Sequence, residues 1–195
     1  MSAKGKLKTS DYLPIDEYYR LLKCLRADKK YIWELYCSIA GCTALRVSDI
    51  LRLKWIEILS DSKVVIKEKK TGNIRKINFS KKNYQKILEL YKLMDEPDVF
   101  SYIIGNPESG QPYTSKHINH TLKRFKIDYQ LKIKSFSTHS FRKTFGRNLY
   151  NSMPNRSEAL ILLMEIFKHS SPDITKRYIG LQDEEIQKAY NIIEL

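Results

Sequence analysis

Apolar residues recur at helical spacing over most of the chain. The segments 15–25 and 31–45 each carry an apolar stripe, with a break at Ala27-Asp28 between them, and a polar, lysine-rich lead over residues 1–10 precedes both. A stripe that repeats every three to four residues predicts an amphipathic helix with one buried face. We expect two packed helices here, with the lead mobile and outside the core.

The same spacing predicts further helices, and one segment departs from it. Residues 63–79 place β-branched residues on both sides of a Thr71-Gly72-Asn73 turn signal, which is typical of a β-hairpin. Residues 98–104 are a candidate short strand. Helices are expected at residues 46–55, 81–94, 114–127, 138–150 and 156–167.

The helix expected from residue 138 has cations at its start. Thr138 is a suitable N-cap, and His139 and Arg142 lie one turn apart just after it. Free backbone N–H groups and the helix dipole make such a start favourable for an anion such as phosphate. The alternative is a basic amphipathic helix whose polar face is only solvated.

A short helix and a final amphipathic segment complete the pattern. Ser171 can cap a helix that begins at Pro172 and stops before Gly180, which puts Tyr178 on the last turn. Residues 183–195 carry another apolar stripe and are expected to form a C-terminal helix. The overall pattern predicts an α+β fold that is mainly α-helical, with a small antiparallel β-hairpin.

Composition bounds the class of protein. With 195 residues and 42% hydrophobic content, the chain can bury one substantial core, so we expect a single domain over residues 1–195. Lysine and arginine total 35 against 22 acids, a formal net charge of +13, which favours nucleic acid as the partner. The three cysteines form no C-x-x-C pair and are expected in the core. Because the longest apolar run, residues 159–164, is too short to span a bilayer, a cytoplasmic protein without membrane contact is expected.

One histidine pair raises the question of a metal. His117 and His120 lie one turn apart on the basic helix 114–127. No cysteine or acid cluster in the sequence partners them, so a helix that touches a nucleic-acid backbone is favoured. Neither a metal nor a cofactor is expected.

Four separated segments offer groups that suit one reaction. Attack on a phosphodiester builds negative charge on the non-bridging oxygens, which preorganised cationic donors stabilise. Arg46, Arg142 and His169 fit that role, since an arginine fork can donate two hydrogen bonds to phosphate oxygens. Tyr178, nine residues after His169, carries a hydroxyl that can act as a nucleophile.

Together these segments resemble the catalytic domain of the tyrosine recombinases, the phage integrase family. The matching stretches, which stand in the family's order, are "TALRVSDILRL", "KEKKTGN", "HSFRKTF" and "FKHSSPDITKRYI". They run from Thr43 to Ile179, most of the chain. The chain departs from many relatives at Phe167-Lys168, where they have leucine-glycine, and at Lys143, where they have histidine. Neither departure removes a catalytic group.

The resemblance implies a role for each matched residue. Tyr178 would form a 3′-phosphotyrosyl link with DNA, while Arg46, Arg142 and His169 would stabilise the phosphate charge. Lys70, in the hairpin, would protonate the leaving 5′-oxygen. Among 13 tyrosines, only its distance from His169 singles out Tyr178.

Two supporting residues are implied as well, and alternatives stay open. His139 would assist proton transfer from the tyrosine or hold the phosphate pocket, and Asp49 would orient Arg46 and its neighbours. Arg46 could instead be a surface arginine paired with Asp49. The lysine hairpin could be only a solvated basic loop. The choice of Lys70 rests on the lysine that directly precedes Thr71-Gly72, and Lys67 and Lys69 are the alternative proton donors.

The family resemblance implies a site-specific DNA recombinase or integrase that needs no metal or nucleotide and exchanges strands between two short sites. Its expected outcome is integration, excision or inversion, through a tetramer assembled on double-stranded DNA, with accessory DNA-bending proteins as further partners. A type IB topoisomerase, which relaxes supercoils alone, and a non-catalytic DNA-binding homologue are the alternatives. The segment 183–195 is expected to dock on a neighbouring protomer or on its own domain.

Relatives usually carry a separate helical DNA-gripping domain before the catalytic one. About 40 residues precede the first motif here, so the usual N-terminal core-binding domain is expected to be absent from this chain. The chain would then be either a minimal recombinase or an excised catalytic domain.

Overall fold

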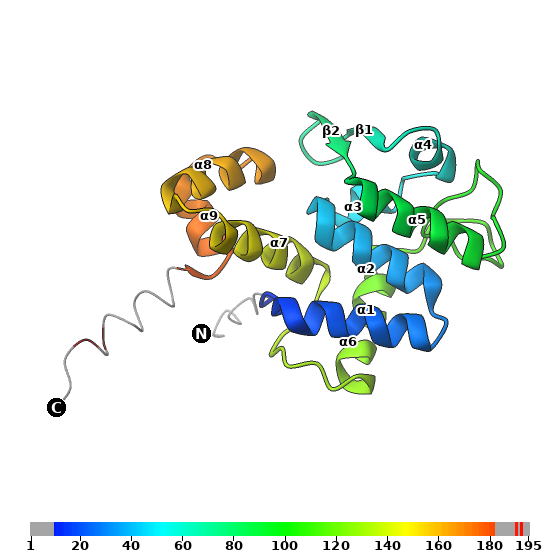
Figure 1. Cartoon of the computed structure of the whole chain (residues 1–195), viewed down its shortest axis with the longest axis horizontal. Helices are drawn as coiled ribbons and strands as arrows, with labels where there is room; N and C mark the ends of the chain where they lie inside the picture. Colours follow the sequence, from blue (N-terminus) through cyan, green and yellow to red (C-terminus); the bar gives the residue numbers. More distant parts are fainter. Residues whose placement is uncertain (1–9, 182–189, 191, 193–195) are drawn as a thin grey trace, which may run out of the picture.

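The computed structural model describes residues 10–181, 190 and 192, and it consists mainly of helices with one β-hairpin (Figure 1). The helices are α1 (Ile15–Ala27), α2 (Tyr31–Thr43), α3 (Val47–Ile50), α4 (Trp55–Leu59), α5 (Lys81–Leu93), α6 (Ser115–Asp128), α7 (Thr138–Ser152), α8 (Arg156–Phe167) and α9 (Pro172–Tyr178). The strands are β1 (Lys63–Lys67) and β2 (Ile74–Asn78). The predicted α+β class is confirmed.

Helix α2 lies at the centre of the larger hydrophobic core. It packs against α1, α3, α5 and α7 (Figure 1). Residues on several of its faces are buried, including Leu35, Tyr36, Ile39 and Ala40. A helix that is apolar on most sides is stable only when other elements surround it. The central place of α2 therefore follows from its sequence, and its end delivers Arg46 to the edge of the core.

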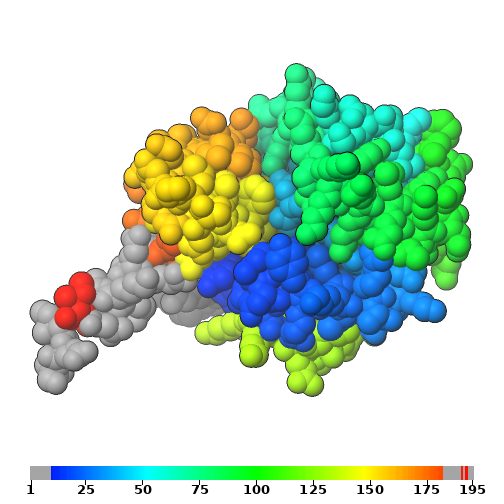
Figure 2. All heavy atoms as spheres, in the orientation of Figure 1, coloured from blue at the N-terminus to red at the C-terminus, as the bar shows by residue number. Residues whose placement is uncertain are grey.

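Helices α8 and α9 belong to a smaller core cluster built on α7, which forms its own lobe in Figure 2. Gly146 of α7 makes this packing close. A β-carbon at position 146 would lie 2.6 Å from Ile179 Cγ2 and 3.2 Å from the Phe167 ring. The contact with Ile179 is shorter than real β-carbons make, so the missing β-carbon lets the end of α9, with Tyr178, approach α7.

The predicted hairpin is present. Strands β1 and β2 pair antiparallel, from Lys63 opposite Asn78 to Lys67 opposite Ile74. Gly72 in the turn has a φ of +71°, a conformation that side chains rarely adopt and glycine adopts freely. The lysine-rich turn therefore projects from the end of a two-stranded ribbon.

Two predictions about elements are wrong. The helix expected over 46–55 ends at Ile50, and Leu53 instead accepts a backbone hydrogen bond from Ile103 at 3.0 Å. Residues 98–104, all of them described, form turns and an isolated bridge between Tyr102 and Lys54 in place of the expected strand. In both cases long-range backbone pairing, which local spacing does not reveal, overrides the local pattern.

The cap of α7 lies one residue earlier than predicted. The Ser137 side chain accepts the His139 backbone N–H at 3.2 Å, and Ser140 Oγ accepts the Ser137 N–H at 3.1 Å. Thr138 is therefore the first helical residue and is buried. The correction keeps His139 and Arg142 near the helix start, where an anion is favoured.

The boundaries of the remaining long helices match the predictions closely. In the described part of the chain, no helix has the length and apolar content that a membrane crossing needs. The predicted lead over residues 1–10 and the C-terminal helix over 183–195 lie outside the described residues, apart from Ser10, Tyr190 and Ile192.

The residue that ends α8 is a lysine in a backbone conformation that glycine adopts with less strain. Lys168 adopts the left-handed conformation, with φ 56° and ψ 48°. This bend lets the His169 N–H donate to the Met164 carbonyl at 3.0 Å, which closes the helix and sets the direction of the chain into α9.

Replacing Lys168 by glycine should relieve this strain. We expect Lys168→Gly to raise the free energy of unfolding by about 0.5–1 kcal/mol, measured by urea denaturation. The matched control is Lys123→Gly, in an exposed interior position of α6, which should lower it by about 1 kcal/mol. A loss of stability in Lys168→Gly would contradict the assignment of strain to this residue.

Candidate active site

The structure places the seven predicted site residues on five separate stretches of the chain. They are Arg46, just before α3; Asp49, in α3; Lys70, in the hairpin turn; His139 and Arg142, near the start of α7; His169, between α8 and α9; and Tyr178, the last residue of α9. All except Asp49 act on one another through hydrogen bonds or charge, with the Tyr178 hydroxyl at the centre.

The Tyr178 hydroxyl lies between a base and a cation. His139 Nδ1 is 3.3 Å from it, and the positive charge of Arg142 acts on it directly. The His169 ring packs edge-on against the Tyr178 ring, with centroids 5.2 Å apart. Burial raises the pKa of Tyr178, although the charges of Arg142 and Arg46 act in the opposite direction. The phenol is therefore protonated at neutral pH and needs a base to become a nucleophile.

His139 is suited to be that base. Part of its surface reaches solvent, yet loss of hydration against its neighbours, followed by the charges of Arg142, Lys143 and Lys70, lowers its pKa. At neutral pH the imidazole is therefore uncharged. An uncharged imidazole can accept the phenol proton, which an imidazolium cannot.

Two arginines are fixed beside the tyrosine. The buried Arg142 guanidinium donates to the Ala44 carbonyl and stacks over the Phe167 ring at 4.8 Å. Arg46 Nη1 donates to Glu68 Oε2 at 2.9 Å, and its Nη2 donates to the Phe167 carbonyl at 3.4 Å. These contacts hold both guanidinium planes and use only some of their five donors. The other donors can bind phosphate oxygens.

His169 is oriented by a contact with the following helix, α9. Its Nδ1 lies 3.0 Å from Thr175 Oγ1. Burial, followed by the charges of Arg142, Arg46 and Lys70, lowers the pKa of His169. The contact with Thr175 occupies one ring nitrogen, which leaves Nε2 for another hydrogen bond.

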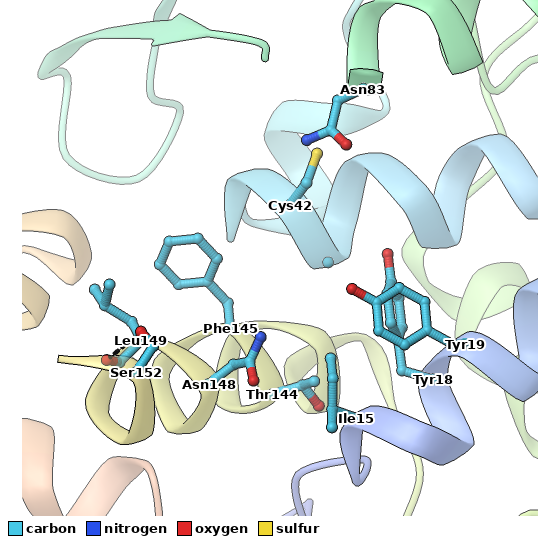
Figure 3. Close-up of a pocket in the computed structure, with 11 residues that line it drawn as sticks. Ile15, Tyr18, Tyr19, Cys42, Asn83, Thr144, Phe145, Asn148, Leu149 and Ser152 are labelled. Carbon is cyan, nitrogen blue, oxygen red and sulfur yellow. Dashed lines mark hydrogen bonds between the residues drawn. The ribbon is translucent and has the colours of Figure 1, made fainter. Parts of the chain in front are cut away.

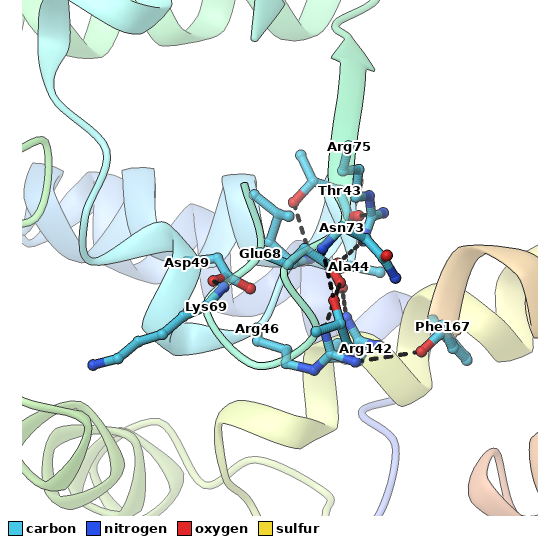
Figure 4. A network of polar contacts seen from close by, with 12 residues as sticks. Thr43, Ala44, Arg46, Asp49, Glu68, Lys69, Asn73, Arg75, Arg142 and Phe167 are labelled. Atoms are coloured by element: carbon cyan, nitrogen blue, oxygen red, sulfur yellow. Dashed lines mark hydrogen bonds and ion pairs between the residues drawn. The ribbon is translucent and has the colours of Figure 1, made fainter. Parts of the chain in front are cut away.

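The hairpin turn presents Lys70 toward this cluster. Lys70 is exposed, and its charge is among those that lower the pKa values of both His139 and His169. The Lys69 side chain points away from Arg46 (Figure 4). Of these two lysines, Lys70 is the better placed to meet a group bound at the arginines.

Asp49 has a different contact from the one expected. Its buried carboxylate oxygen Oδ1 accepts the Lys69 backbone N–H at 2.8 Å and a bond from Arg52 Nη2 at 3.2 Å. Asp49 therefore anchors the hairpin turn to α3. The carboxylate that contacts Arg46 belongs to Glu68.

Sequence reasoning missed Glu68 and Arg75. Glu68 Oε2 accepts hydrogen bonds from Arg46 and, at 2.7 Å, from Thr71 Oγ1, while Glu68 Oε1 lies 3.6 Å from Arg75 Nη1 (Figure 4). Arg75 also donates to the Thr43 carbonyl. The one available signal was a single acid within the basic run "KEKK", and its burial could not be read from that run.

The predicted site lies outside two pockets in the structure. A pocket of about 300 Å³ lies between α1, α2 and α7, lined by residues such as Tyr19, Cys42 and Phe145 (Figure 3). A second, of about 690 Å³, is lined by Trp33, Trp55 and other residues. The lining of neither pocket includes a predicted site residue. A site outside such hollows suits a large substrate that lies across the surface better than a small enclosed molecule.

One histidine of the pair on α6, His117, is engaged in packing, whereas His120 is exposed. His117 stacks on Tyr113, with centroids 4.5 Å apart, and also contacts the Trp33 ring at 5.7 Å. Within residues 10–181, 190 and 192, no group of three or more histidine, cysteine, aspartate or glutamate side chains is arranged to hold a metal ion.

Solved structures share this fold. The chain superposes on XerA recombinase with a TM-score of 0.72, at 18% identity, over 95% of this chain and 66% of that one. It superposes on a lambda integrase dimer bound to a COC′ core site with a TM-score of 0.67, at 18% identity, over 93% and 51%. The chain thus spans about half to two thirds of the length of these solved relatives. At such identities the similarity establishes the fold alone.

Sequence comparison establishes the family. A relative from Bacillus subtilis (strain 168), "Probable integrase/recombinase YoeC", is 31% identical over 150 residues, which cover 77% of this chain and 78% of the relative. The model of the phage integrase family matches residues 11–185. The chain therefore belongs to the phage integrase family, the tyrosine recombinases.

Proposed function

We propose that the chain breaks and rejoins DNA as a site-specific recombinase, with Tyr178 as the nucleophile. The observation that carries the proposal is the position of the Tyr178 hydroxyl, which lies 3.3 Å from His139 Nδ1 and within the influence of the Arg142 charge. A phenol between an uncharged imidazole and a phosphate-binding cation is equipped for attack on phosphorus. Membership of the family supports the same reaction.

In the proposed cleavage step each predicted catalytic residue has one role. The Tyr178 oxygen attacks the phosphorus and passes its proton to His139, while Arg46, Arg142 and His169 stabilise charge on the non-bridging oxygens. The bond from phosphorus to the 5′-oxygen breaks, and Lys70 gives that oxygen its proton. The product is a 3′-phosphotyrosyl link and a free 5′-hydroxyl. Attack by a 5′-hydroxyl from a second duplex then rejoins the strands.

Double-stranded DNA is the proposed partner. The formal net charge of +13 and the cations around the site favour a polyanion, and the solved relatives include an integrase bound to its DNA site. We further propose one catalytic domain over the chain, a tetramer as the active assembly on DNA, and accessory DNA-bending proteins as helpers. These finer points rest on the family.

A direct test captures the reaction and the target together. Nicked duplexes of randomised sequence should yield a covalent complex that survives denaturation, and sequencing the attached DNA should give the cleavage site. Failure to attach would favour a non-catalytic DNA-binding homologue. Relaxation of supercoiled plasmid that lacks the selected site, without strand exchange, would favour a topoisomerase.

The first prediction from the proposed mechanism concerns the nucleophile. Tyr178→Phe should bind the selected DNA normally and form no covalent complex, because it loses only the attacking oxygen. The matched control, Tyr150→Phe, removes a hydroxyl from a tyrosine of α7 outside the site and should still attach. Attachment by Tyr178→Phe, seen on a denaturing gel, would place the nucleophile elsewhere.

The second prediction concerns the leaving group. Without a positioned proton donor, Lys70→Ala should cleave ordinary DNA slower by about a hundredfold or more. A sulfur in the 5′-bridging position leaves readily as a thiolate, so the same variant should be largely restored on that strand. Arg46→Ala and Arg142→Ala should stay slow on both substrates, because the sulfur replaces none of the lost charge stabilisation.

Rescue of a different lysine variant would change this assignment. If the sulfur strand restores Lys67→Ala or Lys69→Ala instead, another hairpin lysine is the donor. Rescue of none of the three would mean that the hairpin only grips DNA.

The third prediction concerns the base. Because His139 must be uncharged and its pKa is lowered, the cleavage rate should hold as pH falls to about 6.5, the ordinary imidazole pKa, and drop only below it. His139→Gln should cleave slower by about a hundredfold and lose that acid limb. An unchanged acid limb in the variant, in a pH-rate series on preselected DNA, would assign the titration to another group.

A further inference from the structure

We propose that Glu68 is a positioning residue that couples the lysine hairpin to the phosphate-binding arginines, so that the proton donor and the charge stabilisers move as one unit. The proposal deepens the proposed function and rests on it. Its basis is a set of contacts that a single buried carboxylate makes to both parts of the site (Figure 4).

One oxygen of Glu68 connects two catalytic elements. Oε2 accepts from Arg46 Nη1 at 2.9 Å and from Thr71 Oγ1 at 2.7 Å. Thr71 follows Lys70 directly in the turn. A shift of the Glu68 carboxylate would therefore disturb the arginine and the lysine turn together.

Glu68 also closes the turn through its backbone. Its N–H donates to the Asn73 carbonyl at 2.9 Å, and its carbonyl accepts the Gly72 N–H at 2.9 Å. The residue thus fixes both ends of the segment that carries Lys70. Since its side chain reaches Arg46, the geometry of the turn and that of the arginine are set by one residue.

The charges around Glu68 explain why an acid is needed there. Arg46, Arg75 and Arg142 are close enough for their charges to affect one another, and like charges at such range repel. Glu68 lies between them with a relative exposure of 2%. Burial alone would raise its pKa, but hydrogen bonds from Thr71 and Arg46 and the arginine charges lower it. The carboxylate is therefore ionised at neutral pH and offsets part of the repulsion.

Arg75 completes the arrangement without competing for the same oxygen. It lies 3.6 Å from Oε1, which leaves Oε2 for Arg46 and Thr71, and it is tied to the Thr43 carbonyl. The carboxylate is thus held from its other side by a cation that is anchored to the end of α2. Rotation of the Glu68 side chain would break contacts on both sides.

The experiment measures cleavage by three variants on the DNA selected by wild-type capture, with either oxygen or sulfur in the 5′-bridging position. Glu68→Gln keeps the shape of the side chain and removes its charge. Thr71→Val keeps Glu68 and removes its link to the turn, together with the 3.4 Å hydrogen bond that the Thr71 hydroxyl accepts from the Asn73 N–H. The matched control is Glu34→Gln, since Glu34 is a buried carboxylate held by Arg26 and Lys86 outside the site. Each rate is taken at a temperature where urea denaturation shows the variant to be folded.

We expect Thr71→Val to cleave ordinary DNA about tenfold slower and to match wild type on the sulfur strand, because only the turn is displaced. Glu68→Gln should be slower by about tenfold or more on ordinary DNA and should recover only in part with sulfur, because Arg46 is displaced as well. Glu34→Gln should match wild type on both strands, since Glu34 contacts no predicted site residue and the rates are taken where the variant is folded.

Two outcomes would overturn the proposal. Glu68→Gln rates equal to those of Glu34→Gln would show that Glu68 positions nothing. Wild-type rates for Thr71→Val, together with a Glu68→Gln defect that sulfur leaves unchanged, would show that Glu68 serves Arg46 and not the hairpin. If wild-type protein captures no DNA at all, the proposed function has failed instead, and this is visible before any variant is made.

Discussion

Repulsion between cations is the constraint on which the site depends. A phosphate in reaction needs several positive groups around it, and these groups must stand close together before any phosphate arrives. In water each would be hydrated and far from the others, whereas here they converge at a partly buried place where repulsion is stronger. The fold holds them by tying each guanidinium to a fixed acceptor: the Ala44 carbonyl for Arg142, and the Phe167 carbonyl with the Glu68 carboxylate for Arg46.

The two histidines limit the same repulsion in another way. The surrounding cations lower the pKa values of His139 and His169, so neither adds a positive charge at neutral pH. This makes His139 a proton acceptor beside a phenol that is itself protonated. In the proposed reaction the phenol proton thus has an acceptor, and the cluster gains positive charge only as the phosphate becomes more negative. The arginines therefore supply permanent positive charge, whereas the histidines stay uncharged and are able to accept a proton.

Much of this arrangement could be predicted from the sequence, because the relevant signals are local. Helical spacing, the Gly72 turn and the cap at Ser171 predicted most of the helices and the hairpin. The spacing of the motifs selected residues such as Arg46 and Tyr178, which the structure brings together. What could not be predicted depends on contacts between distant segments. Glu68 looks like one acid in a basic run until the fold buries it. The segment 98–104 has strand-like composition, yet its partner is the turn before α4.

The division of the interior into two clusters has a consequence for the proposed cleavage. Tyr178 packs on the smaller cluster around Phe167 and Ile179, and Arg46 and Arg142 contact the carbonyl and the ring of the same Phe167. A small cluster can open while a large one stays intact. Such an opening would withdraw the Tyr178 hydroxyl and would also release Arg46 and Arg142 from Phe167. The proposed nucleophile and the arrangement of the cations would thus be lost together, so a local loss of order would leave the site inert and not half assembled.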